Sequence, residues 1–251
     1  MITVMNNEFI KNFKGSKKFG VFLFILIVLS ITSTLVYKLA DISHETYYLV
    51  MNTMTISLEI IPIYMATLTS DMLTEDYKNG TLKNTVLRPI SRGNIILGKA
   101  LFIVVSVMLL IIFNVIFSTF FSSIIFGNDM PSSYELIELL VRGILTAFIL
   151  GAFGMVLIFI SLFTNSSGVA TGFGIGVLFG MKVVSVAFLA LGILPEKFSG
   201  IFITNSFNMF ANNTWTQDKV QFSISFIMVA AYYIVFSLLS IKAFEKKDIL
   251  Y

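Results

Sequence analysis

Six long apolar runs divide the chain, and they constrain its fold more than any other feature. An α-helix needs about 20 largely apolar residues to cross the roughly 30 Å hydrocarbon core of a bilayer. The chain is 57% hydrophobic and 12% charged, which is more apolar than a soluble domain. We therefore expect an all-α polytopic membrane protein with a single transmembrane domain over residues 1–251. The expected spans are residues 19–37, 46–70, 95–125, 136–163, 168–191 and 220–241.

The distribution of Lys and Arg predicts how these spans are oriented. Twelve of the seventeen basic residues lie before the first span, around the loop between the second and third spans, or after the sixth span. Because basic residues favour the cytoplasmic side, both termini are expected in the cytoplasm and the protein in the cell membrane. No cleavable signal is expected, since no small-residue cleavage site follows the first apolar run.

Two segments outside the spans are expected to contact the membrane surface. Residues 1–18 carry Ile2, Met5, Phe9 and Phe13 at helical spacing with lysines on other faces, which predicts an interfacial amphipathic helix. The alternative is a basic flank that only sets the topology. Residues 183–217 include a stretch rich in Ser, Thr and Asn, so we expect an outer re-entrant or loop segment rather than a seventh span.

Small residues recur every four positions in the fourth and fifth spans. Small residues at this spacing allow helix backbones to approach closely in a bilayer. One interpretation is a moving or dimer-forming interface, and the other is static packing of these two spans as a hairpin. The repeats are Gly143, Ala147 and Gly151 in the fourth span, and Gly168, Gly172, Gly176 and Gly180 in the fifth.

Two ionisable residues, Glu59 and Lys182, lie within the expected second and fifth spans. A charge at this depth is costly and is usually paired, protonated or functional. Both are therefore candidates for a transport pathway. Two other interpretations stay open: a structural ion pair between the spans, or a neutral Glu59 bonded to Asn52, Thr55 or a backbone carbonyl.

The densest polar segment, residues 71–94, forms the longest expected cytoplasmic loop. The second span is expected to continue beyond the membrane as a helix that stops at Gly80. Thr81 is expected to cap a second short helix that ends before Pro89. Such a structured projection indicates a docking surface for a cytoplasmic partner, acidic at Glu75 and Asp76.

The loop also contains GNIILGKA, residues 93–100, which nearly matches the phosphate-binding pattern G-x-x-x-x-G-K-[ST]. Ala100 stands where the hydroxyl that holds magnesium is needed, and residues 95–97 already belong to a span. No nucleotide site is therefore expected in this chain. The chain has no Cys, one His and no H-E-x-x-H, so neither an enzyme nor a metal site is expected. No nucleic-acid partner is expected either.

Residues 76–99, DYKNGTLKNTVLRPISRGNIILGK, resemble the cytoplasmic loop of permease subunits of type-2 ATP-binding-cassette (ABC) exporters. The C-terminal FEKKDI, the six spans and the segment before the sixth span are also similar to that family. One departure is that Asp76 stands where a Glu is usual, with Glu75 beside it. The matching positions are Asp76, Gly80, Thr81, Leu82, Pro89, Ser91, Arg92, Gly98 and Lys99.

The resemblance implies a mechanism and two kinds of partner. Two permease chains, identical or not, would form a pathway in the lipid bilayer, and each loop would dock on a separate ABC-type ATPase subunit. ATP and Mg would be bound by that ATPase, so no cofactor is expected in this chain. The residues implied in ATPase coupling are Glu75, Asp76, Gly80, Thr81, Leu82, Pro89 and Arg92.

The expected substrate is a peptide antibiotic, a drug or another amphipathic molecule, since the chain is rich in aromatic residues. The alternative function is an ion-driven secondary transporter that uses Glu59 and Lys182. Such transporters are built from internal repeats, and no convincing repeat relates residues 1–125 to residues 126–251.

Overall fold

A computed structural model describes residues 1–15, 17–40, 45–78, 91–127, 130–211 and 219–246. Almost all of these residues are helical, and no strand occurs among them. Six helices are long and apolar enough to cross a membrane, which confirms the expected all-α class and the six spans. The elements are α1 (Ile2–Gly15), α2 (Lys18–Leu39), α3 (Thr46–Lys78), α5 (Arg92–Phe126), α6 (Ser133–Leu162), α7 (Ser167–Ala190), η1 (Glu196–Ile201), α8 (Ile203–Ala211) and α10 (Lys219–Lys246).

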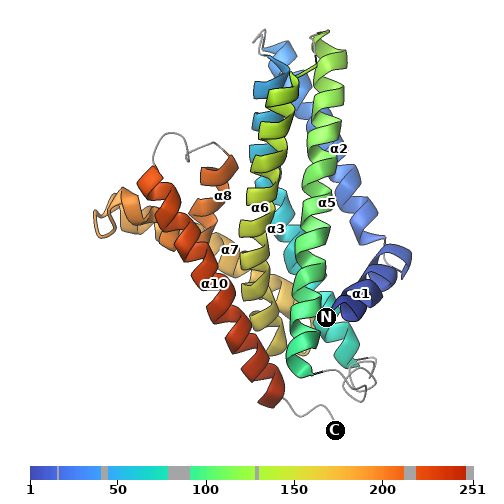
Figure 1. Ribbon diagram of the computed structural model, residues 1–251, viewed down its shortest axis with the longest axis vertical. Helices are drawn as coiled ribbons and strands as arrows, with labels where there is room; N and C mark the ends of the chain where they lie inside the picture. Colours follow the sequence, from blue (N-terminus) through green and yellow to red (C-terminus); the bar gives the residue numbers. More distant parts are fainter. Residues whose placement is uncertain (16, 41–44, 79–90, 128–129, 212–218, 247–251) are drawn as a thin grey trace.

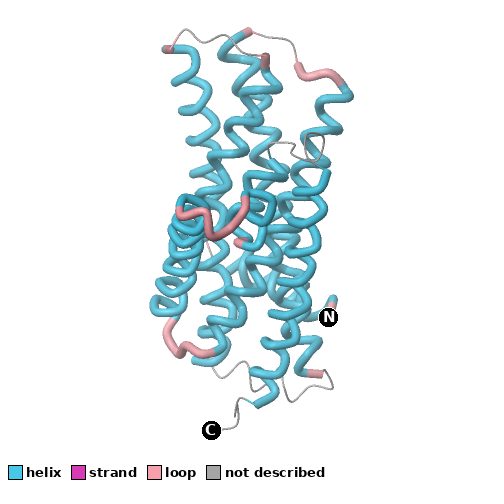
Figure 2. The backbone as a smooth tube through the Cα atoms, turned by 90° about the vertical axis from the view of Figure 1, so that its left-hand side faces the viewer, coloured by secondary structure: helices cyan, strands magenta, loops and turns pink. Residues whose placement is uncertain are grey.

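The helices α3, α5 and α6 stand together at the centre of the molecule, with α2 on one side and α7 and α10 on the other (Figure 1). The view turned by 90° shows the same long bundle (Figure 2). Helix α1 lies across the lower end of the bundle, and the last turn of α10 reaches the same end. The two described ends of the chain therefore lie on one side of the bundle, as the expected topology requires.

Close packing at the centre depends on residues without a bulky side chain. Gly151 of α6 faces Tyr233 of α10 and Val104 of α5, and a Cβ atom there would overlap the Tyr233 hydroxyl. The Tyr233 hydroxyl instead donates a hydrogen bond of 2.9 Å to the Phe148 carbonyl. A glycine at this position thus lets three helices meet, as small residues do in membrane bundles.

Helices α2 and α5 are joined by hydroxyl pairs in one register. Ser30 Oγ lies 3.2 Å from Ser118 Oγ, and Thr34 Oγ1 lies 3.4 Å from Ser122 Oγ. All four side chains are buried. Hydroxyl pairs of this kind link helices whose surfaces are otherwise too apolar for the hydrophobic effect to join them in lipid.

The segment before the sixth span differs from the sequence prediction. Helix α7 continues to Ala190, so the predicted outer segment begins several residues too early at residue 183. Gly192 then turns the chain with a φ of 67°, and η1 and α8 follow. Helix α8 packs inward, because the ring of Phe207 lies edge-on to that of Phe153 at 5.8 Å.

Helix α1 buries a face that is only partly the predicted apolar stripe. Met5 and Phe9 pack against the core, but Ile2 is exposed. Among the described side chains of α1, Val4, Glu8 and Asn12 are buried, so a carboxylate lies on its inner face. The reason lies in α5, where a buried cation faces Glu8.

Candidate functional site

The candidate site is formed around the end of α3 and the start of α5, the two helices that flank residues 79–90. Helix α3 has 33 residues, a length of about 50 Å that exceeds the roughly 30 Å of hydrocarbon. Its last turns therefore extend beyond the apolar span and end at Lys78. Helix α5 begins at Arg92, and Ser91 Oγ accepts a hydrogen bond of 3.3 Å from the Asn94 N–H. This cap satisfies one of the free amides at the helix start.

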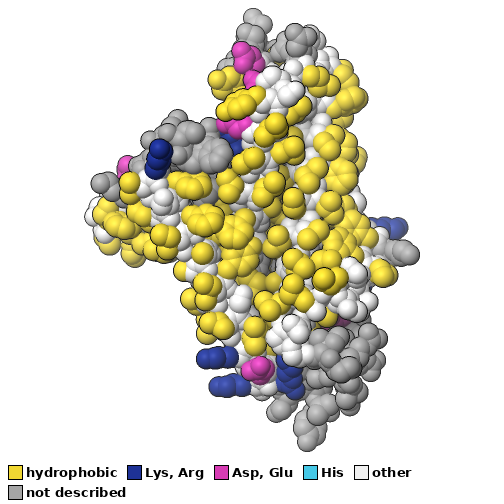
Figure 3. Space-filling model, viewed as in Figure 1, with side chains coloured by type: hydrophobic (Ala, Val, Ile, Leu, Met, Phe, Trp, Pro, Cys, Tyr) yellow, Lys and Arg dark blue, Asp and Glu magenta, His cyan; other side chains and the backbone are white. Residues whose placement is uncertain are grey.

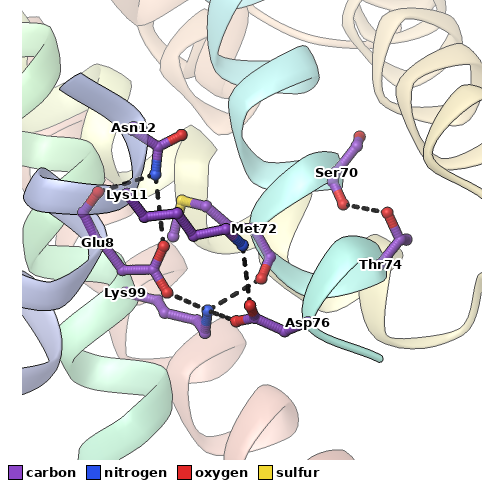
Figure 4. Close-up of polar contacts among 8 residues, drawn as sticks. All are labelled: Glu8, Lys11, Asn12, Ser70, Met72, Thr74, Asp76 and Lys99. Carbon is purple, nitrogen blue, oxygen red and sulfur yellow. Dashed lines mark hydrogen bonds and ion pairs between the residues drawn. The ribbon is translucent and has the colours of Figure 1, made fainter. Parts of the chain in front are cut away.

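Lys99 is the centre of a buried charge cluster between α1, α3 and α5 (Figure 4). Its ammonium group contacts a carboxylate oxygen of Glu8 and lies 2.6 Å from Asp76 Oδ2. It also donates a hydrogen bond of 2.9 Å to the Met72 carbonyl. The Lys99 side chain is only 2% exposed, and three acceptors match the three N–H donors of an ammonium.

Two further residues of α1 complete the cluster. Lys11 Nζ lies 2.8 Å from Asp76 Oδ1, so each oxygen of Asp76 faces a different lysine. Asn12 Nδ2 donates to the Glu8 carbonyl at 3.0 Å and lies 3.4 Å from Glu8 Oε2. Glu8, Asp76, Lys11 and Lys99 together carry no net charge, which lowers the cost of burying them.

Gly98 brings the backbone of α1 close enough for these contacts. A Cβ atom at Gly98 would lie 2.7 Å from Val4 Cβ and 2.8 Å from the Met1 carbonyl oxygen, both too close for a real side chain. The adjacent residues Gly98 and Lys99 therefore act together. Gly98 leaves room for the backbone of α1, and Lys99 binds a carboxylate of α1.

The cluster also changes the protonation of Asp76. Burial alone would raise the pKa of this carboxyl group, but the charges of Lys99 and Lys11 and their hydrogen bonds lower it below its ordinary value. Asp76 is therefore ionised at neutral pH and holds both lysines. The last turns of α3 are fixed to α5 and α1 by charge as well as by packing.

A second ion pair joins α3 to its other neighbours one turn higher. Lys18 of α2 contacts Asp71 Oδ2, and the Ser167 hydroxyl at the start of α7 donates to Asp71 Oδ1. Asp71 is buried, with 8% of its surface exposed. The lower part of α3 is thus tied by carboxylates to α1, α2, α5 and α7.

Arg92 fixes the other flank of residues 79–90. Its guanidinium donates to the Phe244 carbonyl at 3.1 Å and to the Glu245 carbonyl at 2.7 Å. These carbonyls belong to the last turn of α10, where helix acceptors lack intrahelical partners and the dipole favours a cation. The start of α5 is therefore attached to the end of α10.

Glu59 and Lys182 contact each other across α3 and α7. The side chain of Glu59 is 53% exposed and that of Lys182 is 27% exposed. The pairing of these two residues, one of the interpretations of the sequence, is present in the structure. Because the pair lies on an uncovered face of the chain, it differs from the buried cluster at Lys99.

The glycine repeat of α7 faces open space. A Cβ atom at Gly168, Gly172, Gly176 or Gly180 would meet nothing within 4 Å. The hypothesis that this repeat packs α7 statically against the fourth span is therefore wrong. The contact that brings α7 inward is made by Gly174, where a Cβ would lie 2.8 Å from Leu157 Cδ2 and 3.2 Å from Ala66 Cβ. Packing of the repeat against a second chain stays a prediction.

The open face of α7 is hollowed into an apolar groove of about 720 Å³. Its one contribution from outside α7 is Phe202, and its size falls within the roughly 300–1,000 Å³ typical of small-molecule sites. In the part of the chain that the structure describes, no three His, Asp or Glu side chains gather at a spacing that would hold a metal ion. The lining residues are Val169, Gly172, Phe173, Gly176, Val177, Gly180, Met181, Val184 and Phe202.

Comparison with known proteins places the chain in a family through its sequence. Residues 21–250 match the family described as "Protein of unknown function (DUF2705)". The chain belongs to the DUF2705 family. No curated protein matched the chain.

Within this DUF2705 chain, the sequence-predicted loop residues fall into two groups. Gly80, Thr81, Leu82 and Pro89 lie outside the described residues, and of Glu75 only the helical backbone is described. Asp76 and Arg92 are described, and both bind other helices of the chain. Residues 93–100, the segment that nearly matches a phosphate loop, belong to helix α5.

Sequence reasoning singled out Lys99 as a position that matches the family's loop, and it did not predict that Lys99 is buried in an ion cluster. It also missed Glu8 and Lys11 as partners of this region. A signal for Glu8 was present in the sequence. Glu8 lies four residues after Val4 and four before Asn12, on the face that carries Met5 and Phe9, where an acid is unusual unless it is paired.

Proposed function

We propose that the chain is the permease subunit of an ABC exporter in the cell membrane, with both termini and residues 79–90 in the cytoplasm. In this proposal residues 79–90 dock on a separate ATPase subunit that binds ATP and Mg. The similarity of residues 76–99 to the family's cytoplasmic loop supports the assignment. The observation that carries it is the way in which both flanks of this loop are fixed to other helices.

A force applied to residues 79–90 would reach most of the bundle. On one flank Asp76 binds Lys99 of α5 and Lys11 of α1. On the other flank Arg92 binds the end of α10. A loop that only connected two spans would need no such attachments, whereas a loop that transmits movement needs rigid contacts to the helices it drives.

In this proposal the two neighbouring acids, Glu75 and Asp76, have different roles. Asp76 is 13% exposed and holds two lysines of its own chain, which makes it a positioning residue rather than a contact for a partner. We therefore assign the contact with the ATPase to Glu75 and to residues 80–82. Helix α7, with the apolar groove on one face and Lys182, which contacts Glu59, outside that groove, is the proposed wall of the pathway.

The α7 face also supports the proposed substrate and the proposed second subunit. An apolar groove on α7 and a separate exposed ion pair on the same helix suit an amphipathic molecule such as a peptide antibiotic or a drug. A second permease chain, identical or related, would close the pathway opposite α7. The exposed glycines of α7 would allow its backbone to come close to the partner helix.

The test is co-purification from native membranes in mild detergent, followed by mass spectrometry. The variant Glu75→Ala with Gly80→Pro is compared with Glu196→Ala, which alters an acid at the start of η1, outside the loop and its flanks. We expect a soluble ATP-binding protein with the wild type and with Glu196→Ala, and its loss with the loop variant. An absence of any such protein in stoichiometric amount from the wild type would contradict the proposal.

A second candidate is an ion-driven carrier, favoured by the contact between Glu59 and Lys182. In such a carrier the carboxylate exchanges Lys182 for a transported proton or cation. Transport by liposomes that contain only this chain distinguishes the two functions. Uptake that is driven by an ion gradient without ATP, and that is lost in Glu59→Gln, would favour the carrier over the permease.

A further inference from the structure

A second groove, of about 650 Å³, lies between the lower ends of α6 and α10. It is separate from the α7 face and from the cluster at Lys99, and neither the family nor the proposed coupling role assigns it a ligand. Its lining residues are Phe159, Leu162, Phe163, Asn165, Leu239, Lys242, Ala243 and Lys246.

The upper part of this groove is apolar and aromatic. The rings of Phe159 and Phe163 meet edge-on at 5.0 Å, and Phe159 also meets Phe236 of α10 at 5.7 Å. Phe163 is 68% exposed and Leu239 is 42% exposed, so the surface is open to its surroundings. In a bilayer such a surface contacts hydrocarbon, and its concave shape would hold one acyl chain.

The lower part of the groove is cationic. Lys242 and Lys246 lie one helical turn apart on α10 and both line the groove, whereas Glu245 between them does not. Both lysines are exposed, and neither is bound to a carboxylate of the described residues. Asn165, which follows α6, adds an amide on the other side. Basic side chains gather at this end of α10 (Figure 3).

The apolar part and the cationic part of the groove follow each other in the same order as the parts of one amphiphilic molecule. An apolar slot that ends at two ammonium groups and an amide is complementary to an acyl chain that ends at a phosphate. We propose that this groove binds one anionic phospholipid of the cytoplasmic leaflet, with its acyl chain on Phe159, Phe163 and Leu239 and its phosphate at Lys242 and Lys246. The proposal rests on the proposed orientation of the chain, but not on its docking to an ATPase.

The occupied groove would fasten α6 to the end of α10, and the carbonyls of that end bind Arg92. Basic pockets between helices on the cytoplasmic side are typical sites for anionic headgroups. Each lysine near an anionic headgroup strengthens binding about fivefold, so the two together account for about 25-fold.

The test is native mass spectrometry of the delipidated protein, titrated with dioleoyl phosphatidylglycerol or dioleoyl phosphatidylcholine. The double variant Lys242→Gln, Lys246→Gln is compared with Lys38→Gln, Lys219→Gln, which removes the same charge at the opposite end. We expect tighter binding of phosphatidylglycerol by the wild type, a loss of about 25-fold in the first variant and less than a twofold change in the control. Thermal unfolding in detergent verifies that both variants remain folded.

A third variant tests the apolar slot with both lysines in place. Ala243→Phe fills the groove without changing charge, and we expect it to weaken phosphatidylglycerol binding while unfolding at the wild-type temperature. The proposal is overturned if the wild type binds both lipids equally, or if the control variant loses as much as Lys242→Gln, Lys246→Gln. Since these readouts need no ATPase, they stay separate from the test of the permease function.

Discussion

Lys99 and Lys182 both contact carboxylates, but their surroundings differ. Lys99 is 2% exposed and binds two acids and a carbonyl from two other helices. Lys182 is 27% exposed, and Glu59, which it contacts, is 53% exposed. A buried cation needs all of its donors satisfied, whereas an exposed one exchanges partners at little cost. The first contact therefore fixes the structure, whereas the second is the one that the proposed function assigns to the pathway.

The glycines of α6 and α7 show the same difference between a buried and an exposed site. Gly151 of α6 is enclosed by Tyr233 and Val104, so the centre of the bundle is complete within one chain. Gly176 of α7 faces open space beside an apolar groove. The centre of the molecule is thus closely packed within one chain, whereas the α7 face is open in that chain.

The largest expected effect is that of Lys99→Met. This change leaves Glu8 buried without a cation and Asp76 with Lys11 alone, and breaking a buried pair in this way costs about 3–5 kcal/mol of stability. Thermal and denaturant unfolding in detergent measure it. A loss below about 1 kcal/mol would show that Lys99 contributes no more to stability than an exposed lysine does. The difference drawn between Lys99 and Lys182 would then be wrong.

Gly151→Ala is expected to cost about 1–3 kcal/mol, because the added methyl group overlaps the Tyr233 hydroxyl and Val104. Gly176→Ala has no such overlap, and its better helix propensity is expected to stabilise the single chain by up to about 1 kcal/mol. The same unfolding assay compares the two. Equal losses would show that the α7 face is covered within the chain itself.

A smaller effect is expected from pH. The pKa of Asp76 is lowered in the folded protein, so its contribution to stability is complete above its unfolded pKa of about 3.9. That contribution is lost as the pH falls through the lowered pKa of the folded state. Unfolding measured from about pH 6 to pH 3 should show the gap between the wild type and Asp76→Asn closing on acidification. A difference in stability that stays constant over this pH range would remove Asp76 from the cluster.

The smallest effect is expected for Lys182→Met. Because the Glu59–Lys182 pair is largely exposed, its loss should cost about 0–1 kcal/mol. The matched comparison is Lys99→Met in the same detergent. A loss as large as that of Lys99→Met would make the exposed pair a structural element and argue against its place in a pathway.

The sequence predicted the parts of the fold that depend on periodicity and length. The spans, the continuation of α3 past residue 70 and the helix at the N-terminus all follow from apolar runs and spacing. The expected fifth span, residues 168–191, ends where α7 does, but the expected outer segment began at residue 183, inside that helix. The apolar sequence VSVAFLALGIL does not mark where a helix stops, and Gly192 was the better signal for the start of the outer segment. Contacts between distant residues were harder to predict.

The candidate site shows that limit most clearly. The pairing of Glu59 with Lys182 was accessible, because these were the only two ionisable residues expected deep in the spans. The partners of Lys99 were not, because three helices contribute to the cluster and several acids near residue 76 were equally available. Only the close approach of α1 at Gly98 selects Glu8.

The most direct test of the proposed function is photo-crosslinking in living cells. A photoreactive amino acid is placed at Leu82, within the loop proposed to dock on the ATPase, and at Ser133 at the start of α6 as the control. The adducts are identified by mass spectrometry after tryptic digestion. The proposal predicts an adduct between residue 82 and a soluble ATP-binding protein, and none from residue 133. If residue 82 forms no adduct with an ATP-binding protein while the chain is inserted and folded, the permease assignment is contradicted.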